Sequence, residues 1–171
     1  MNILPTNRRL KGLTLIEGLL FLGVAAIVVV GAVVLYNNAS NTTKLNQAKS
    51  QVQAIVGGVK SLYASQASYA SVTTDLVRQA GIAPSNTVQG NNLRNPWSGL
   101  ITIAGTNTEF TVSYAGVPTE ACTDLVSAGL SGDGSVIGLD VNNNAIAQNP
   151  TPAAALAACN RAANTVAFNA R

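Results

Sequence analysis

The hydrophobic positions divide the chain into a long apolar run, an amphipathic segment and a mixed remainder. Residues 13–36 read LTLIEGLLFLGVAAIVVVGAVVLY, and Glu17 is the only charged residue among them. As a helix this run extends about 36 Å, enough to cross the roughly 30 Å hydrocarbon core of a bilayer. It is also longer than the apolar core of a cleavable secretory signal and continues into helix-forming sequence. The run therefore predicts a membrane-spanning helix.

After Tyr36 the pattern changes to a single apolar stripe at helical spacing. The stripe predicts that the helix continues to about Ser65, with residues 37–65 packed on a head domain. A coiled-coil dimer seam is the weaker alternative, because the stripe covers fewer than three heptads and lacks flanking charge pairs. Two segments where such a helix can bend are 37–43, rich in poor helix formers, and Gly57-Gly58. The members of the stripe are Leu45, Ala48, Val52, Ile55, Val59 and Leu62.

Residues 66–171 contain no internal repeat and predict an α+β head domain. Its helices are bounded by Pro, Gly and Thr, and its strands are runs rich in β-branched and aromatic residues. In chain order, the predicted elements are a helix at 71–80, a turn-rich loop at 85–99, a hairpin of strands at 100–104 and 109–115, a helix at 118–128, a strand at 135–141, a turn at 142–144, a helix from 152 to about 162 and a closing strand at 165–169.

The net charge of +3 belongs to the N-terminal end of the chain. Arg8, Arg9 and Lys11 precede the apolar run, whereas basic and acidic residues balance after Gly12. The basic cluster keeps the N-terminus cytoplasmic by the positive-inside rule, so the residues after Tyr36 lie outside. Without a basic run in the head, nothing indicates binding to nucleic acid.

Glu17 is the anomaly of the apolar run. An ionised carboxylate in hydrocarbon costs several kcal/mol and requires a partner, and the run contains no Lys or Arg. A cut between Gly12 and Leu13 would create an α-amino group four residues before Glu17. That amine would pair with the carboxylate within or between subunits. The equally weighted alternative is that Glu17 lies near the cytoplasmic headgroups and is solvated there.

The segment Lys11-Gly12-Leu13-Thr14-Leu15-Ile16-Glu17 resembles the type III signal of type IV prepilins. The resemblance implies that a prepilin peptidase cuts after Gly12 and N-methylates Leu13. It also implies that Glu17 contacts the terminal amine of a neighbouring subunit during assembly. Leu13 replaces the Phe that often follows the cut in this family. This difference and the twelve-residue leader favour the type IVb branch.

Cys122 and Cys159 lie in the part predicted to be outside the membrane. An oxidising compartment favours a disulfide between them, and two buried free thiols are the alternative. The predicted helices at 118–128 and 152–162 carry one cysteine each, and a bridge would contribute about 3–4 kcal/mol. The resemblance agrees, because pilins commonly have a C-terminal disulfide-bounded region, here 122–159, that contributes exposed and variable surface.

The head offers little chemistry of its own. The chain has no His, and its Ser and Thr side chains lack a recognisable base, so catalysis is not expected. Asp133, Asp140 and the run Asn142–Asn144 supply oxygen atoms for calcium, but turn formation is the favoured interpretation. Neither a metal nor a cofactor is expected. Trp97 is assigned to core packing in preference to a contact surface.

The resemblance as a whole implies the type IV pilin fold and a structural role. The fold joins a cleaved leader at 1–12, a transmembrane and filament-core helix at 13–36, an amphipathic helix at 37–65 and an antiparallel head with one disulfide at 66–171. The expected partners are further copies in a homopolymeric filament, the prepilin peptidase, the inner-membrane assembly machinery and, before assembly, the inner membrane itself. The head would be periplasmic before assembly and extracellular afterwards. The alternatives are a minor pilin, a type II secretion pseudopilin or, less favoured, a signal-anchored periplasmic binding domain.

Overall fold

The computed structural model describes residues 14–128 and 135–171. The chain is divided into two compact units, Met1–Ser40 and Asn41–Arg171. The first element, α1, spans Leu15–Leu62 and so contributes to both units. It is helical through 37–43 and through Gly57-Gly58, the two segments where a bend was considered, and it ends three residues before the predicted Ser65.

Within the described residues, the second unit contains a sheet of seven strands in the order β1-β2-β3-β4-β7-β5-β6, with every neighbouring pair antiparallel. The predicted hairpin is confirmed by β3 and β4. The last strand, β7, lies between β4 and β5, so the end of the chain forms an internal strand of the sheet. The strands span Val88–Gln89 (β1), Asn92–Arg94 (β2), Leu100–Gly105 (β3), Phe110–Val117 (β4), Val136–Val141 (β5), Asn144–Ile146 (β6) and Asn164–Ala170 (β7).

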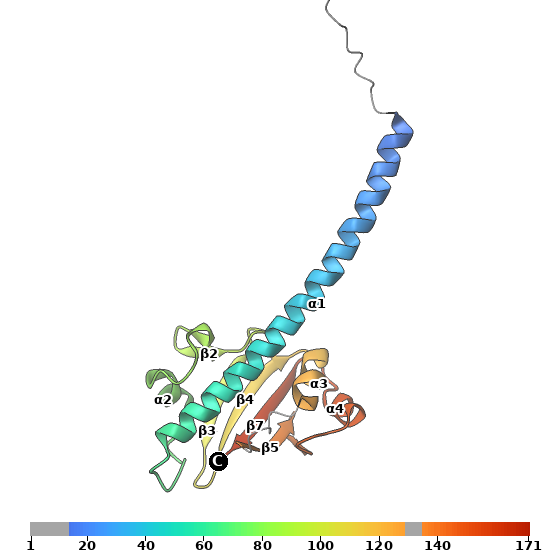
Figure 1. Ribbon diagram of the computed structural model, residues 1–171. Coiled ribbons are helices and arrows are strands. Elements are labelled where there is room, and N and C mark those ends of the chain that lie inside the picture. Colours follow the sequence, from blue (N-terminus) through green and yellow to red (C-terminus); the bar gives the residue numbers. More distant parts are fainter. Residues whose placement is uncertain (1–13, 129–134) are drawn as a thin grey trace, which may run out of the picture. The chain divides into compact units, whose positions relative to one another are not determined.

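Residues 41–62 of α1, the part of this helix that belongs to the second unit, cross one face of the sheet (Figure 1). The middle of the apolar stripe is fully buried, with Ala48, Val52, Ile55 and Val59 each at 0% exposure. These side chains meet alternate residues of the central strands in one core, among them Val112 on β4 and Phe168 on β7. Because the stripe is covered by its own chain, it is not free to form the coiled-coil seam considered above.

In the part of the chain that the structure describes, three short helices flank the sheet. Helix α2 spans Thr74–Gln79, and its N-cap Thr73 accepts a hydrogen bond from the Leu76 amide. Helix α3 spans Thr119–Ser127, as predicted within one residue at each end. Helix α4 spans Pro152–Ala158, and the prediction that it continues to about Ala162 is wrong. Cys159 leaves helical geometry, and the backbone beyond it bonds instead to the side chain of Asn164.

Other differences from prediction lie at the edges of the sheet. The segment 85–99, expected to be a loop, contains a 3-10 turn at Ser85–Thr87 (η1) and the strands β1 and β2. The turn predicted at 142–144 is limited to Asn142 and Asn143, and Asn144 already belongs to β6. These strands are two or three residues long, too short to show the alternation of apolar and polar positions that marks a strand. Their pairing partners, not their own sequence, make them strands.

Candidate functional site

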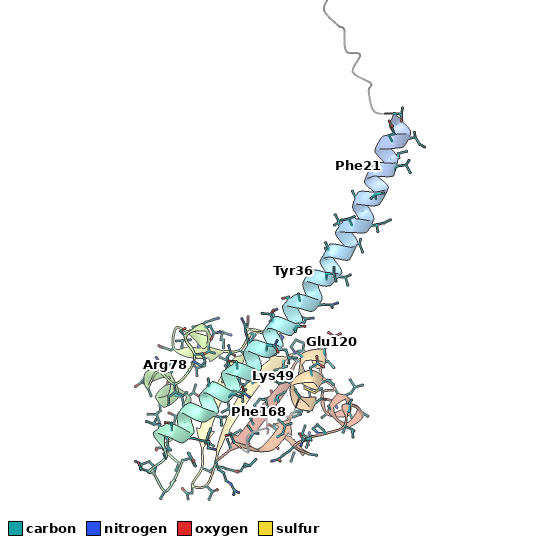
Figure 2. The ribbon with its side chains drawn as sticks, in the orientation of Figure 1. Phe21, Tyr36, Lys49, Arg78, Glu120 and Phe168 are labelled. Carbon is teal, nitrogen blue, oxygen red and sulfur yellow. A yellow bond between two sulfur atoms is a disulfide. The ribbon has the colours of Figure 1, made fainter. Side chains whose placement is uncertain are left out.

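The first candidate site is the apolar part of α1. Among the described residues, α1 is the one helix long and apolar enough to cross a membrane. Its large side chains are exposed along the whole run, and Phe21 and Tyr36 remain 74% and 73% exposed (Figure 2). So large an apolar surface is not left in water by a stable protein, because each buried Å² contributes about 25 cal/mol. The run is therefore a surface for lipid or for other protein.

The start of α1 is fixed by Thr14 and Glu17. The Glu17 Oε2 atom accepts hydrogen bonds from the Thr14 amide at 2.9 Å and from the Thr14 hydroxyl at 3.0 Å. In return, the Glu17 amide donates to Thr14 Oγ1 at 3.3 Å. This reciprocal arrangement is a capping box, which satisfies backbone donors at a helix N-terminus. The role of Glu17 as a helix cap was not recognised from the sequence, although the spacing Thr-x-x-Glu signals it.

The remaining predicted residues of this site, Gly12 and Leu13, lie outside the described residues, as does the basic leader before them. Both Thr14 donors meet Oε2, and no donor among the described residues bonds to Oε1 of Glu17. The capping box therefore orients the carboxylate through one oxygen and leaves the other for a further donor.

The second candidate site is the region between the cysteines. A disulfide joins Cys122 on α3 to Cys159 directly after α4, with their Cα atoms 5.9 Å apart, so the predicted bridge is confirmed. Both residues are fully buried. The two helices pack against each other, and the Thr119 hydroxyl at the start of α3 donates to the Arg161 carbonyl at 2.9 Å.

A buried asparagine anchors this region to the sheet. Asn164, at 0% exposure, donates to the Arg161 carbonyl at 2.6 Å and to the Val117 carbonyl at 3.4 Å. Its Oδ1 atom accepts from the Arg161 amide at 3.2 Å and from the side chain of Asn142 at 2.9 Å. One side chain thus joins β4, the segment after α4 and the turn before β6. Asn164 was not among the residues predicted from the sequence.

The residues considered for calcium form a turn and a surface network. Asn142 and Asn143 have φ values of 54° and 68°, the left-handed conformation that Asn tolerates in turns. Asp140 accepts a hydrogen bond from the Asn169 side chain at 2.7 Å. Asp133 lies outside the described residues. Within 14–128 and 135–171, no three His, Cys, Asp or Glu side chains gather where they could hold a metal ion.

Trp97 is half-buried and packs against the core, in agreement with its predicted role. Its loop is held by Asn95, a buried residue that was not predicted from the sequence. The Asn95 Oδ1 atom accepts from the Trp97 and Gly99 amides at 3.0 Å each, and its Nδ2 atom donates to the Ala115 carbonyl at 2.7 Å. The described sites are thus an exposed apolar helix and a cross-linked head.

Comparison with known proteins agrees with this architecture. Residues 42–171 match the family model described as PilS N terminal. The chain belongs to the PilS family. It is a type IV pilin and is most similar to the type IVb pilins. Its long N-terminal helix, antiparallel sheet and single disulfide confirm the predicted α+β pilin fold.

Curated relatives and solved structures show the same likeness. The pilin is 28% identical over 142 residues to proteins named major structural subunit of bundle-forming pilus from Escherichia coli O111:H- and O127:H6. These alignments cover 78% of this chain and 74% of each relative. A crystal structure of a type IVb pilin from Salmonella typhi matches with a TM-score of 0.62 and 26% identity, over 74% of this chain and 99% of that one. TcpA, a type IV pilin from Vibrio cholerae El Tor, supports the fold alone, with a TM-score of 0.53 and 16% identity over 75% of this chain and 99% of TcpA.

Proposed function

We propose that this pilin is a structural subunit that polymerises into a helical extracellular type IV pilus. The observation that carries the proposal is the exposed apolar run of α1, in which Glu17 is the only charged residue. A lipid anchor requires only apolar length, whereas a single oriented carboxylate in such a run requires a specific cationic partner. The curated relatives named as structural subunits of a pilus support the same role.

The cationic partner in this proposal is an α-amino group created by proteolysis. Prepilin peptidase cuts between Gly12 and Leu13, and Leu13 becomes the N-methylated terminus. The capping box holds Glu17 through Oε2, so Oε1 accepts from the terminal amine of a neighbouring subunit. Such a pair sets the axial register of the filament, because any other stagger leaves a charge unpaired in an apolar core.

The proposed segments have successive roles. Residues 1–12 keep the N-terminus cytoplasmic and are then removed, and residues 13–36 first span the inner membrane and later form the filament core. Residues 37–65 connect this helix to the head at 66–171, which is periplasmic before assembly and extracellular afterwards. The partners are other copies of the pilin, the peptidase and the inner-membrane assembly machinery. The pilin itself has no enzymatic role in this proposal.

Mass spectrometry and electron microscopy of sheared surface material test the proposal together. We expect filaments that contain this chain as their main component, with a mature N-terminus at methylated Leu13. An intact Met1 in surface filaments would refute the processing step. A chain that stays monomeric in the membrane of cells with a working assembly machinery would refute the structural role.

A further inference from the structure

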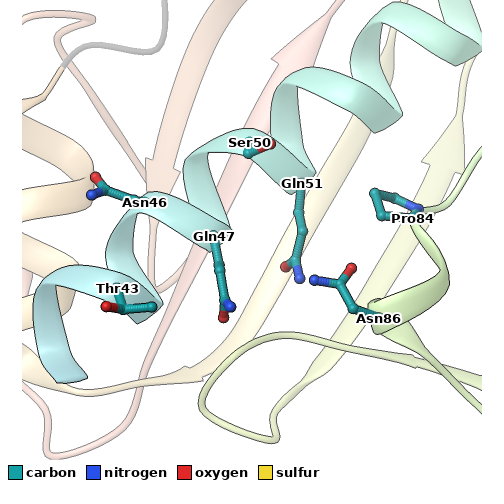
Figure 3. A pocket seen from close by; sticks show the side chains of 7 residues that line it. All are labelled: Thr43, Asn46, Gln47, Ser50, Gln51, Pro84 and Asn86. Carbon is teal, nitrogen blue, oxygen red and sulfur yellow. The ribbon is translucent and has the colours of Figure 1, made fainter.

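A groove lined by seven uncharged residues, six of which carry an amide or a hydroxyl group, lies along residues 43–51 of α1. Figure 3 shows Asn46, Gln47, Ser50 and Gln51 of α1 on one side and Pro84 and Asn86 on the other. The groove has a volume of about 380 Å³. Its α1 residues recur at three- and four-residue spacing, so they form a second stripe on the helix. This stripe lies beside the apolar one that is buried under the sheet.

Gln51 is the unusual member of the groove. It is only 4% exposed, yet its Oε1 atom accepts no hydrogen bond from the described part of the chain. A buried carbonyl oxygen without a donor costs about 1–3 kcal/mol. The side chains of Gln51 and Asn86 extend toward each other in Figure 3, and no hydrogen bond joins them. Because the terminal torsion of Gln is broad, its amide can turn toward a donor that enters the groove.

The lining restricts what can bind. Every lining side chain is uncharged, so the groove has no ion pair to offer a charged ligand. None of the lining residues is aromatic, and the groove therefore lacks the flat surface on which a sugar ring or a base would stack. Side-chain amides present one acceptor and two donors each, the complement of the N–H and C=O groups of a polypeptide. The chemistry of the groove thus favours a polypeptide segment.

We propose that this groove receives a polypeptide segment of a second copy of the pilin in the assembled filament. The inference rests on the proposed function and adds a contact to it. The first lining residue, Thr43, follows Tyr36, the end of the exposed run, by seven residues of the same helix. Under the proposed function, the run and the groove would both contact further copies. Its neutral lining allows identical chains to approach without repulsion between like charges.

The test compares two substitutions that introduce the same charge on the same helix. Gln47→Glu places a carboxylate in the groove, whereas Gln53→Glu places one at an exposed position outside its lining. In cells that carry the assembly machinery, we expect Gln47→Glu to lower filament yield about tenfold relative to Gln53→Glu, because contact with a second copy would bury the new charge. Membrane levels and protease resistance of both full-length variants should match those of the unaltered pilin, since both positions are exposed.

A photoreactive side chain at position 47 then identifies the neighbour. We expect irradiation of intact filaments to give covalent subunit dimers from position 47, with Asn107, in the exposed β3–β4 turn, as the control position. Equal filament yields for the two charge variants, or cross-links only to a different protein, would overturn the groove proposal. If the unaltered pilin formed no filaments, the proposed function would fail first, so the two failures are distinguishable.

Discussion

The side chain of Asn142 donates a hydrogen bond to Asn164 Oδ1 at 2.9 Å, joining the turn after β5 to the first residue of β7. Asn142 also accepts from the Thr165 amide at 3.1 Å and donates to the Ala158 carbonyl at 3.2 Å. Asn164 in turn bonds the carbonyls of Val117 and Arg161. The two amides therefore hold the cysteine-bounded region against the central strand without any charged group.

Replacing Asn164 with Ala should lower the free energy of unfolding by about 2–4 kcal/mol, since the substitution leaves several buried polar partners unsatisfied. Thermal unfolding of the full chain in detergent measures the change. The matched control is Asn107→Ala, which removes an exposed side chain whose contact with Ser68 is 3.4 Å long. That control should change stability by less than about 0.5 kcal/mol. Equal effects of the two substitutions would contradict the anchoring role of Asn164.

Removing the disulfide should destabilise the head by about 3–4 kcal/mol, because the cross-link restricts the unfolded chain across a sequence separation of 37 residues. The paired substitution of Cys122 and Cys159 by Ala is compared with the unaltered pilin under reducing and oxidising conditions. Reduction should lower the melting temperature of the unaltered pilin but not that of the double variant. An oxidised pilin no more stable than the double variant would show that the bridge adds nothing to the fold.

The sequence predicted those parts of the fold in which one physical factor dominates. The spacing of Ala48, Val52 and Ile55 places them on one helix face, and burial of that face follows from their apolarity. The disulfide follows because the chain contains only two cysteines. The prediction of a membrane-spanning helix required only the length of the apolar run. The role assigned to Glu17 came from the resemblance of Lys11–Glu17 to a prepilin signal.

The features missed from the sequence depend on contacts between distant residues. The sequence of β7 does not indicate that this strand enters the sheet between β4 and β5. The strand order depends on which strands pair most favourably, and these lie far apart in the sequence. Asn142 and Asn164 could not be recognised as anchors, since asparagine is equally common in solvated turns. The groove beside Gln51 exists because a segment some thirty residues later in the sequence folds back along α1.

The adjacent glycines of α1 should respond to substitution in opposite directions. A Cβ at Gly58 would overlap the side chain of Ile82, whereas a Cβ at Gly57 would meet nothing within 4 Å. Gly58→Ala should therefore destabilise the head by about 1–3 kcal/mol through overpacking. Gly57→Ala should stabilise it by up to about 1 kcal/mol through helix propensity. Denaturant unfolding of both variants measures the difference.

The cause of the Gly58 effect is tested by shortening its neighbour. Combining Gly58→Ala with Ile82→Ala should cost less than the sum of the two single changes, because the smaller side chain removes the overlap. Strict additivity would indicate that Gly58 matters for a reason other than its approach to Ile82.

Tyr114 should make the head sensitive to alkaline pH. It is fully buried, its hydroxyl has no partner among the described residues, and burial raises the pKa of Tyr114 above its usual value near 10. The unfolded chain releases this proton as pH rises above about 10, whereas the native state retains it. The contribution of this residue to stability is therefore fully present below pH 10. It falls above pH 10 by about 1.4 kcal/mol per pH unit until the native pKa is reached.

Tyr114→Phe isolates this contribution. The variant should unfold at a higher pH than the unaltered pilin, and below pH 9 its stability should be equal or higher, because an unpaired buried hydroxyl is removed. The measurement is denaturant unfolding across a pH series. A variant that is much less stable at neutral pH would mean that the hydroxyl has a hydrogen-bond partner in solution.

Glu17 combines two roles that a pair of substitutions can separate. Gln at position 17 retains the capping box with Thr14, since Gln serves as well as Glu at this position of the motif, but it has no charge. Ala removes both the cap and the charge.

If the carboxylate pairs with the amine of a neighbour, Glu17→Gln and Glu17→Ala should both leave membrane insertion and cleavage after Gly12 largely intact. Both should also lower incorporation into filaments by tenfold or more, on the order of the cost of an unpaired buried charge. The measurement is the amount of each variant in sheared filaments relative to the membrane. Normal incorporation of Glu17→Gln with loss of Glu17→Ala would show instead that assembly needs the helix cap and not the ion pair.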